Sequence, residues 1–356
     1  MRIVSLDRKK GVVELQLEGP EDLYYLALLV RKGDIVCGWT WRQLRVERGL
    51  RTIRGERVRV YLCIKLEHVE FHRFTEKLRL RGQIVEAPES LHAKGAYHTL
   101  SVGEGDTIKI SKGRPLTRLE LKLIEEASAH TKRALLISVD VEEAAIAVLR
   151  PQGLEVKIKL TYPLSRRETK SLKSHLEKAL KSVASAAREV LANVNAELVL
   201  ILASTLTLEC CREVLLPVLN DFATIKIVKV SIGGLEGLYE ALRSQEIRKV
   251  INDLRIAREF EYVEKLIKEL GGQGRVALGL AEVGKALEWG VVKELLILDD
   301  LVLSEEEALS VVQHAAEHGI PFIIITSESE AGDTLKRLGG VAAILYYRPG
   351  DSHAEG

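Results

Sequence analysis

The sequence predicts a multidomain protein of mixed α+β and α/β class, in which a small β-barrel domain precedes two α/β domains. The chain has 356 residues, about two to three times the length of an ordinary domain. Its first third shows the two-residue alternation of half-buried strands, and from about residue 134 strand patterns alternate with helical ones. We therefore expect domains at residues 1–127, 128–255 and 256–356.

The first third predicts strands separated by turns. Residues 58–66 give the clearest signal, because every second residue from Val58 to Leu66 is apolar. Further strands are expected at 11–17, 71–85 and 97–110, and one helix is expected at 21–31, closed by Gly33. These elements indicate a small barrel that carries a helix near its start.

The middle third predicts an α/β domain with one long helix. Apolar residues recur every three or four positions from Leu172 to Val194, and Ser165 with Glu168 has the spacing of a capping box. Aliphatic runs predict the strands at 134–140, 144–150, 156–160, 198–204 and 227–232.

The last third predicts an α/β/α arrangement. A helix at 256–270 is expected to end at Gly271 and Gly272, and a later helix is expected to be capped by Ser304 with Glu307 and to end at Gly319. A further helix ends at Gly290, and strands are expected at 275–280, 294–300, 321–327 and 341–347.

Charge is unevenly distributed along the chain. Residues 1–127 hold 24 basic and 18 acidic residues, 128–255 hold 19 and 15, and 256–356 hold 9 and 18. The net charges are therefore +6, +4 and −9. Two basic thirds favour polyanions such as RNA as partners, and the alternative is a scatter of surface charge without functional meaning.

Cysteine usage and hydropathy indicate a cytoplasmic protein. The four cysteines form no Cys-x-x-Cys pair, which points to a reducing compartment. The first ten residues lack the apolar core of a signal peptide, and no run of eighteen uncharged apolar residues occurs. We expect no membrane partner.

The densest chemical signal is an arginine-rich segment at residues 42–59. Arginine suits phosphate because its planar guanidinium group stays charged and donates paired hydrogen bonds, and a glycine-containing loop can place several of them along an RNA backbone. The alternative is a solvated charged hairpin. The expected RNA contacts are Arg42, Arg45, Arg48, Arg51, Arg54, Arg57 and Arg59.

A second basic segment lies at the start of the long helix, where backbone N–H groups add donors for a phosphate. A solvated helix face would have the same sequence. The candidate contacts to tRNA or rRNA are Arg166, Arg167, Lys170 and Lys173.

Two motif-like segments are interpreted as coincidences. Residues 279–286 approach a nucleotide-binding P-loop, but Ala286 lacks the hydroxyl that holds magnesium and Glu282 would repel phosphate. Residues 271–273 spell Gly-Gly-Gln, the peptide-releasing tripeptide of release factors, but they follow a predicted helix as its cap.

No catalytic residue and no cofactor is predicted. The histidines have no metal-ligand spacing. The adjacent acidic pairs Glu21-Asp22 and Asp299-Asp300 have the chemistry for a divalent ion, but such pairs are common at helix starts and strand ends.

Several short segments together form a specific pattern: Glu21 to Leu26, Gly33-Asp34, Thr40, Arg42, Leu78 to Gly82, Gly95 to Leu100, Asp140 before Ala144, Ser231 to Gly234, Gly237, Leu238, Glu240, Glu282-Val283 with Ala286, and Leu295 to Asp299. On these residues the chain resembles the archaeal Pelota family, relatives of the class-1 translation release factor, over essentially its whole length.

The resemblance implies an Sm-like first domain, a central domain that contacts a GTPase and lacks the Gly-Gly-Gln loop, and a last domain of ribosomal-protein-like fold that contacts partners. It implies a monomeric factor for ribosome rescue, in no-go decay, nonstop surveillance and ribosome recycling. Such a factor enters the empty A site with an elongation factor 1-alpha type GTPase in its GTP form. An ATP-binding-cassette recycling factor then splits the subunits.

The resemblance also assigns roles to segments. Residues 163–173 correspond to a basic segment of the central domain, and residues 42–59 to a loop that reaches toward the decoding centre and mRNA channel. Many relatives have Pro-Gly-Phe near the GTPase contact, whereas this chain has Ser204, Thr205, Leu206 and Thr207. An alternative function attributed to some members is a divalent-metal-dependent endoribonuclease in the first domain, although metal-dependent cleavage needs clustered carboxylates and not arginines.

Overall fold

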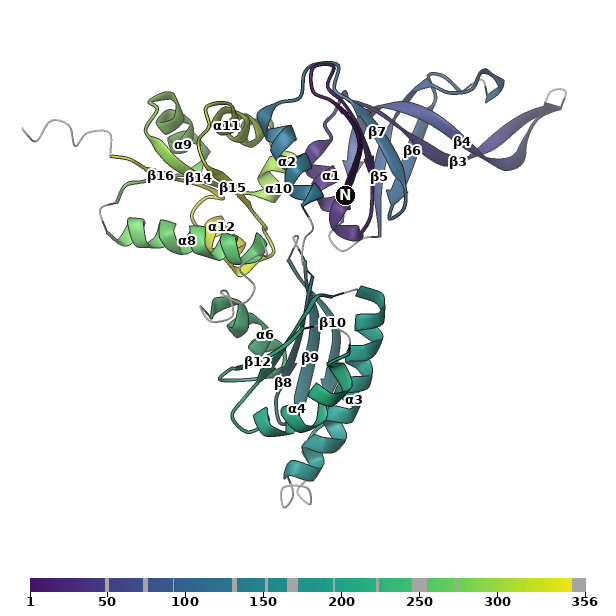
Figure 1. Cartoon of the computed structure of the whole chain (residues 1–356). Coiled ribbons are helices and arrows are strands. Elements are labelled where there is room, and N and C mark those ends of the chain that lie inside the picture. Colours follow the sequence, from purple (N-terminus) through teal and green to yellow (C-terminus); the bar gives the residue numbers. More distant parts are fainter. Residues whose placement is uncertain are drawn as a thin grey trace, which may run out of the picture. The chain divides into compact units, whose positions relative to one another are not determined.

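The strands of the described part of the chain form three sheets (Figure 1). The seven-stranded sheet has the order β1-β2-β7-β3-β4-β5-β6, the five-stranded sheet β10-β9-β8-β11-β12 and the four-stranded sheet β13-β16-β14-β15. The computed structural model describes residues 1–48, 51–72, 76–91, 93–129, 133–150, 153–164, 172–194, 196–221, 224–244, 255–272 and 274–347.

The chain divides into two compact units. The first contains residues 1–130 and 280–322, and the second contains residues 131–279 and 323–356. The three domain ranges expected from the sequence stay a prediction. No helix in the described ranges is both long enough and apolar enough to cross a membrane.

The first unit contains the expected small barrel with a helix near its start. Neighbouring strands pair antiparallel throughout. Thr40 Oγ1 of β3 lies 3.0 Å from His98 Nε2 of β6, although two strands separate β3 from β6 in the sheet order, so the sheet curls round on itself. The elements are β1 (Arg2–Asp7), β2 (Val12–Gln16), α1 (Pro20–Leu29), β3 (Ile35–Arg48), β4 (Arg51–Glu70), β5 (Lys77–Glu86), β6 (Tyr97–Gly103) and β7 (Thr107–Ser111).

A buried ionic cluster joins the end of β7 to α2 (Arg118–Ser128). Lys112 Nζ lies 2.7 Å from Asp34 Oδ2 and 3.1 Å from Glu120 Oε1, and Arg114 Nη1 lies 2.9 Å from Glu120 Oε2. Glu120 also forms a capping box with Thr117 at the start of α2. Burial alone would raise the pKa of Glu120, but the hydrogen bonds from Arg114 and the charge of Lys112 outweigh it and lower the pKa to about 2.

Glu120→Gln should therefore reduce stability in a pH-dependent way. A carboxylate whose pKa is depressed on folding stabilises the fold above its unfolded pKa of about 4.5, and this stabilisation is lost as pH falls toward about 2. We expect a loss on the order of 3 kcal/mol at neutral pH, measured by denaturant unfolding, that shrinks below about pH 4.5. A loss that stays constant down to pH 3 would contradict this assignment.

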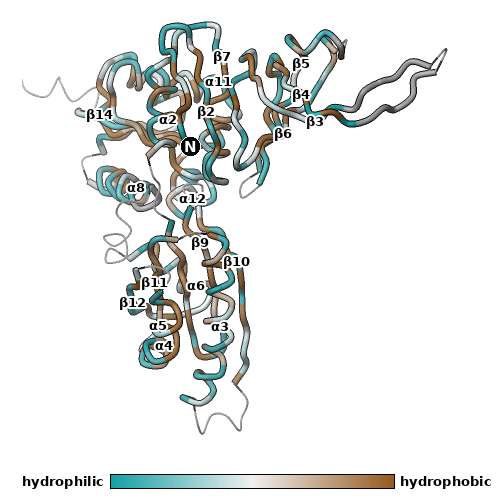
Figure 2. The backbone as a smooth tube through the Cα atoms, turned by 45° about the vertical axis from the view of Figure 1, so that its right-hand side comes forward, coloured by the Kyte–Doolittle hydropathy of each residue, from teal (hydrophilic) through white to brown (hydrophobic). Residues whose placement is uncertain are grey.

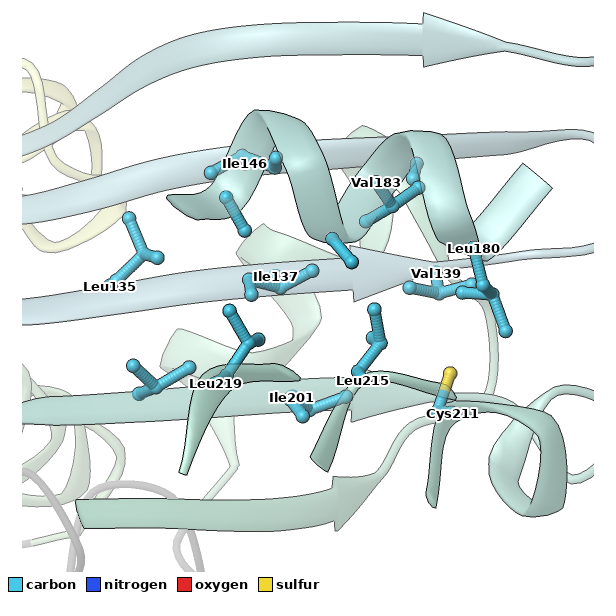
Figure 3. Close-up of a cluster of buried hydrophobic side chains, with 14 of the residues drawn as sticks. Leu135, Ile137, Val139, Ile146, Leu180, Val183, Ile201, Cys211, Leu215 and Leu219 are labelled. Carbon is cyan, nitrogen blue, oxygen red and sulfur yellow. The ribbon is translucent and has the colours of Figure 1, made fainter. Parts of the chain in front are cut away.

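The second unit contains the expected α/β domain core. β8 (Ala134–Val139), β11 (Leu198–Ala203) and β12 (Thr224–Lys229) pair in parallel, and β9 (Glu143–Arg150) and β10 (Gly153–Thr161) extend the sheet antiparallel. Side chains from β8, β11, α3 (Leu172–Val194), α4 (Leu208–Val214) and α5 (Leu216–Leu219) fill one face of the sheet (Figure 3). Figure 2 shows hydrophobic stretches along the strands of this sheet.

A close approach between β8 and α6 (Gly234–Arg243) requires glycine at two positions. A Cβ atom on Gly233 would lie 2.1 Å from the Val139 carbonyl oxygen, and one on Gly237 would lie 2.4 Å from Ser138 Oγ. The Gly233 N–H donates to Asp140 Oδ2 at 3.0 Å, which holds the start of α6 against the end of β8.

The last third of the sequence supplies α8 (Arg255–Gly271), β13 (Val276–Leu278), α9 (Gly279–Glu288), β14 (Val292–Leu298), α10 (Asp299–Ser304), α11 (Glu306–Glu317), β15 (Phe322–Ile325), α12 (Glu330–Arg337) and β16 (Val341–Leu345). The buried Glu259 side chain of α8 accepts hydrogen bonds from the Thr326 N–H at 3.1 Å and from Thr326 Oγ1 at 2.9 Å. This bond ties α8 to the end of β15.

The capping box expected at Ser304 and Glu307 is wrong. The chain turns into α10 directly after β14, so Ser304 is the last residue of α10 and its hydroxyl donates to the Asp300 carbonyl oxygen at 2.6 Å. Glu305 is the N-cap residue of α11, and its side chain makes no capping bond. Ser165 and Glu168 lie outside the described residues, and the sequence did not predict β1, β3, α2, α10 or α12.

Gly233→Ala should lower the stability of the full chain by about 2 kcal/mol or more, because the added methyl group has no space. Gly284→Ala is the matched control, since Gly284 lies inside α9 and an added Cβ meets nothing within 4 Å. The control should raise stability by roughly 0.5–1 kcal/mol. Calorimetric unfolding measures the stability of both variants. Equal changes in stability for Gly233→Ala and Gly284→Ala would contradict the packing argument.

Candidate RNA-binding and partner-binding surfaces

The arginine-rich segment is a β-hairpin and not a loop. β3 and β4 pair from Ile35 opposite Lys65 to Arg48 opposite Arg51, so all seven arginines lie on strands. The expectation of a turn-like loop over 42–59 is therefore corrected. The register shifts between Gln43 and Arg45, which places one extra residue in β4 near Gly55.

Most of this hairpin is a two-stranded ribbon. β3 pairs with β7 only from Ile35 to Gly38, and β4 pairs with β5 only from Cys63 onward. In the described ladders, residues 39–48 and 51–61 therefore pair only with each other, and Figure 1 shows β3 and β4 continuing past the neighbouring strands. We call residues 39–48 and 51–61 the arginine ribbon.

The ribbon brings the arginine positions together in pairs. Arg45 is opposite Arg54, and Arg48 is opposite Arg51, in the backbone register; the side chains of these four residues lie outside the described part. Arg57 and Arg59 are exposed. Arg42 is half-buried, and its charge adds to burial in lowering the pKa of His98.

Exposed aromatic side chains lie at the barrel end of the ribbon. Trp39 and Trp41 expose 51% and 63% of their surface. Trp39 is opposite Tyr61 with ring centroids 5.6 Å apart, and the Arg59 guanidinium carbon lies 5.2 Å from the Trp39 ring centroid. The sequence analysis missed these residues, although the Trp-x-Trp spacing on a strand places both rings on one face.

The second basic segment is mostly outside the described residues. Arg166, Arg167 and Lys170 lie outside the described residues, whereas Lys173 lies in the first turn of α3. Lys173 Nζ lies 2.8 Å from Glu213 Oε2 of α4, and both side chains are exposed. The RNA contact of this segment stays a prediction.

The four candidate GTPase-contact residues divide into two buried and two exposed. Ser204 and Thr207 are buried, and Thr207 Oγ1 donates to the Val139 carbonyl oxygen at 3.2 Å. This bond fixes the turn between β11 and α4 against the end of β8. Thr205 is exposed and Leu206 exposes 65% of its surface, so these two side chains are accessible to a partner.

The acidic pairs take part in structural contacts. Asp22 accepts a hydrogen bond from the N-terminal ammonium group of Met1 at 2.8 Å and from the Glu18 N–H at 2.7 Å. Asp299 is fully buried and accepts from the Tyr24 hydroxyl at 3.1 Å. Within the described ranges, no three His, Cys, Asp or Glu side chains are grouped as metal ligands would be.

The cysteine pattern differs from the expectation. Cys37 and Cys63 are directly opposite in β3 and β4 and form a disulfide bond, whereas Cys210 and Cys211 are free and buried. Cys37 and Cys63 are 26 residues apart in sequence, and this spacing does not predict a disulfide bond. The pairing register of β3 and β4 brings the two cysteines together.

The two motif-like segments lie where the chain needs turns and helices. Gly271 ends α8, Gln273 lies outside the described residues, and the left-handed residue after the helix is Gly274, with φ 65°, and not Gly271. α9 begins at Gly279 directly after β13 and contains Lys285, so no loop separates strand from helix as a P-loop requires.

Comparisons with known proteins match both ends of the chain. Residues 1–128 match the family model of the Pelota N-terminal domain, and residues 256–349 match that of eRF1 domain 3. The protein pelota homolog of Thermofilum pendens is 41% identical over 353 residues, which cover 98% of this chain and 99% of the relative.

Solved structures share the fold. Pelota of Thermoplasma acidophilum has a TM-score of 0.72 at 21% identity and covers 98% of this chain and 100% of its own. S. cerevisiae Dom34, described as a translation termination-like factor involved in RNA quality control pathways and interacting with Hbs1, has a TM-score of 0.50 at 21% identity and covers 99% of each chain.

These matches confirm the fold class expected from the sequence, with a barrel first and domains related to those of release factors after it. Two domain models together match more than half of the chain, and a relative 41% identical aligns with nearly all of it. The chain therefore belongs to the Pelota family.

Proposed function

We propose that this protein recognises and rescues ribosomes stalled on mRNA, and that it does so by binding and not by catalysis. It enters the empty A site together with an elongation factor 1-alpha type GTPase in its GTP form. An ATP-binding-cassette recycling factor then splits the subunits. The protein acts as a cytoplasmic monomer without a cofactor.

The arginine ribbon is the observation that carries this proposal. The ribbon carries arginine positions along both of its strands, so guanidinium groups from either strand can bind the phosphates of an RNA backbone. Membership in the Pelota family supports the same role, as does the description of the yeast protein of the same fold as a termination-like factor in RNA quality control.

The endoribonuclease alternative receives less support from the described carboxylates. Asp22 of the pair at residues 21 and 22 is bonded to the N-terminal ammonium group, and Asp299 is bonded to Tyr24. Metal-assisted cleavage of a phosphodiester needs carboxylates directed at an RNA groove. The groups on the ribbon that face RNA are arginines instead.

The GTPase contact is proposed at Thr205 and Leu206. The Thr207 bond to β8 makes the turn rigid, so the two exposed side chains are presented without further ordering. Dom34, of the same fold, is described as interacting with Hbs1, and we propose a partner of this kind here.

Co-sedimentation with stalled ribosomes tests the proposed function. The protein should associate with ribosomes in the presence of the GTPase and a GTP analogue, and much less with GDP. It should leave naked RNA intact. Cleavage of naked RNA by the protein alone in magnesium buffer would favour the nuclease instead.

Replacement of Arg45, Arg48, Arg51 and Arg54 by Ala should weaken ribosome binding. Each arginine that contacts a phosphate releases about one counterion, so the log-log salt slope should fall by up to about three units. Alanine at Lys265, Lys268, Lys293 and Lys336, all exposed in the acidic last third, is the matched control and should change the slope by less than about one unit. If the ribbon variant binds ribosomes with unchanged affinity and unchanged salt slope, the ribbon is a solvated hairpin that does not contact RNA.

Leu206→Asp should abolish or strongly weaken GTPase binding while leaving stability within about 0.5 kcal/mol of the parent, because Leu206 is largely exposed. Leu270→Asp, at an exposed leucine of α8, is the matched control and should bind normally. Titration of the labelled GTPase with each variant measures the effect. Equal affinities for both variants would place the contact elsewhere.

A further inference from the structure

The barrel end of the arginine ribbon exposes more aromatic surface than folding requires. Trp39 and Trp41 are separated by one residue on β3, and Tyr61 is opposite Trp39 on β4. All three side chains are exposed. Exposed clusters of large aromatic side chains on soluble proteins usually mark a binding surface. The barrel core does not account for these rings, because the buried residues of β4 in this region are Val60 and Leu62, which alternate with the exposed Tyr61.

A hollow of about 400 Å³ lies against these rings. This volume is within the range of small-molecule sites and accepts a nucleotide-sized group. Its lining combines two tryptophans with cations and hydroxyls: Trp39, Trp41, Arg59, Lys77, Thr99 and Ser101. Asp106 also borders the hollow, but its Oδ2 atom accepts the Gly103 N–H at 2.9 Å.

The arrangement suits an unpaired nucleobase. Indole rings stack on the flat faces of bases, and an arginine guanidinium group adds a cation for the neighbouring phosphate. Arg59 already lies over the Trp39 ring, which keeps the guanidinium group beside the stacking surface. The hydroxyls of Thr99 and Ser101 can donate to or accept from a base edge or a ribose 2′-hydroxyl.

The charge of the surroundings selects RNA over an apolar protein partner. Arg57 and Arg59 are exposed next to the two tryptophans, and the paired arginine positions of the ribbon continue directly from them. A strand of RNA whose backbone follows the ribbon therefore has its bases within reach of the tryptophans.

We infer that Trp39 and Trp41 form a stacking site for unpaired bases of single-stranded RNA, at the barrel end of the arginine ribbon. This inference rests on the proposed function for its biological setting, but its chemistry needs no ribosome. The arginines supply affinity for the backbone of any RNA, and the tryptophans supply preference for unpaired bases over a duplex.

Titration of the full-length protein with a short fluorescein-labelled single-stranded RNA tests the inference, with the same RNA annealed to its complement as a second probe. Trp41→Ala should weaken binding to the single strand by about tenfold or more, with an unchanged salt slope, and should affect the duplex much less. Trp41→Tyr should retain most of the affinity, because a smaller aromatic ring still stacks. Trp41 is preferred to Trp39 because Trp39 also contacts Arg59.

Trp289→Ala is the matched control, since Trp289 exposes 59% of its surface but lies in the acidic last third of the sequence. It should bind RNA like the parent. The inference is overturned if Trp41→Ala binds the single strand normally, or if it loses single strand and duplex equally. It is also overturned if Trp41→Ala loses ribosomes but keeps RNA, which would indicate a protein contact at this face.

The two proposals fail in distinguishable ways. If the tryptophan variants bind RNA normally while the parent protein and its GTPase bind stalled ribosomes, only the stacking site is rejected. If the parent protein fails to bind stalled ribosomes, the rescue function is rejected, and the RNA titration still reports on stacking.

Discussion

The antiparallel pairing of β3 with β4 is the interaction on which the candidate RNA surface depends. This pairing runs from Ile35 opposite Lys65 to Arg48 opposite Arg51, with one register shift between Gln43 and Arg45, and it determines three separate features. It places Cys37 against Cys63, Trp39 against Tyr61, and Arg45 against Arg54. A slip of one residue in this pairing would move every side chain of the slipped strand to the other face of the ribbon. The disulfide bond between Cys37 and Cys63 and the bulge near Gly55 oppose such a slip.

In the second unit, the candidate GTPase-contact surface depends on the end of β8. The Val139 carbonyl oxygen accepts from Thr207, and the closely packed Gly233 lies against the same backbone group. The neighbouring Asp140 side chain accepts from the Gly233 N–H. The loops after β11 and β12 are therefore held at the carboxyl ends of parallel strands, where α/β proteins present their binding residues. In this turn Ser204 and Thr207 are buried, whereas Leu206 is exposed.

Much of the fold could be predicted from periodicity, and the misses have physical causes. The stripe from Leu172 to Val194 predicted α3, because a long amphipathic helix has a strong local signal. The helix α2 was missed although Thr117 and Glu120 form a capping box, because the buried Glu120 puts a charged residue at a core position of this helix, where it pairs with Lys112 from the end of β7. Ser304 was taken for an N-cap because its spacing to Glu307 is right, but the short helix α10 already occupies that residue.

The sequence by itself determined the family, the fold class and most of the strands and helices, because these depend on residue types and local spacing. The tertiary structure decided which of those residues can act together. It turned an expected loop into a ribbon, buried two of the four candidate GTPase-contact residues, used Asp22 to hold the N-terminus, and placed two tryptophans beside Arg59. Each of these outcomes depends on strand register or on packing between segments distant in sequence, which local patterns do not encode.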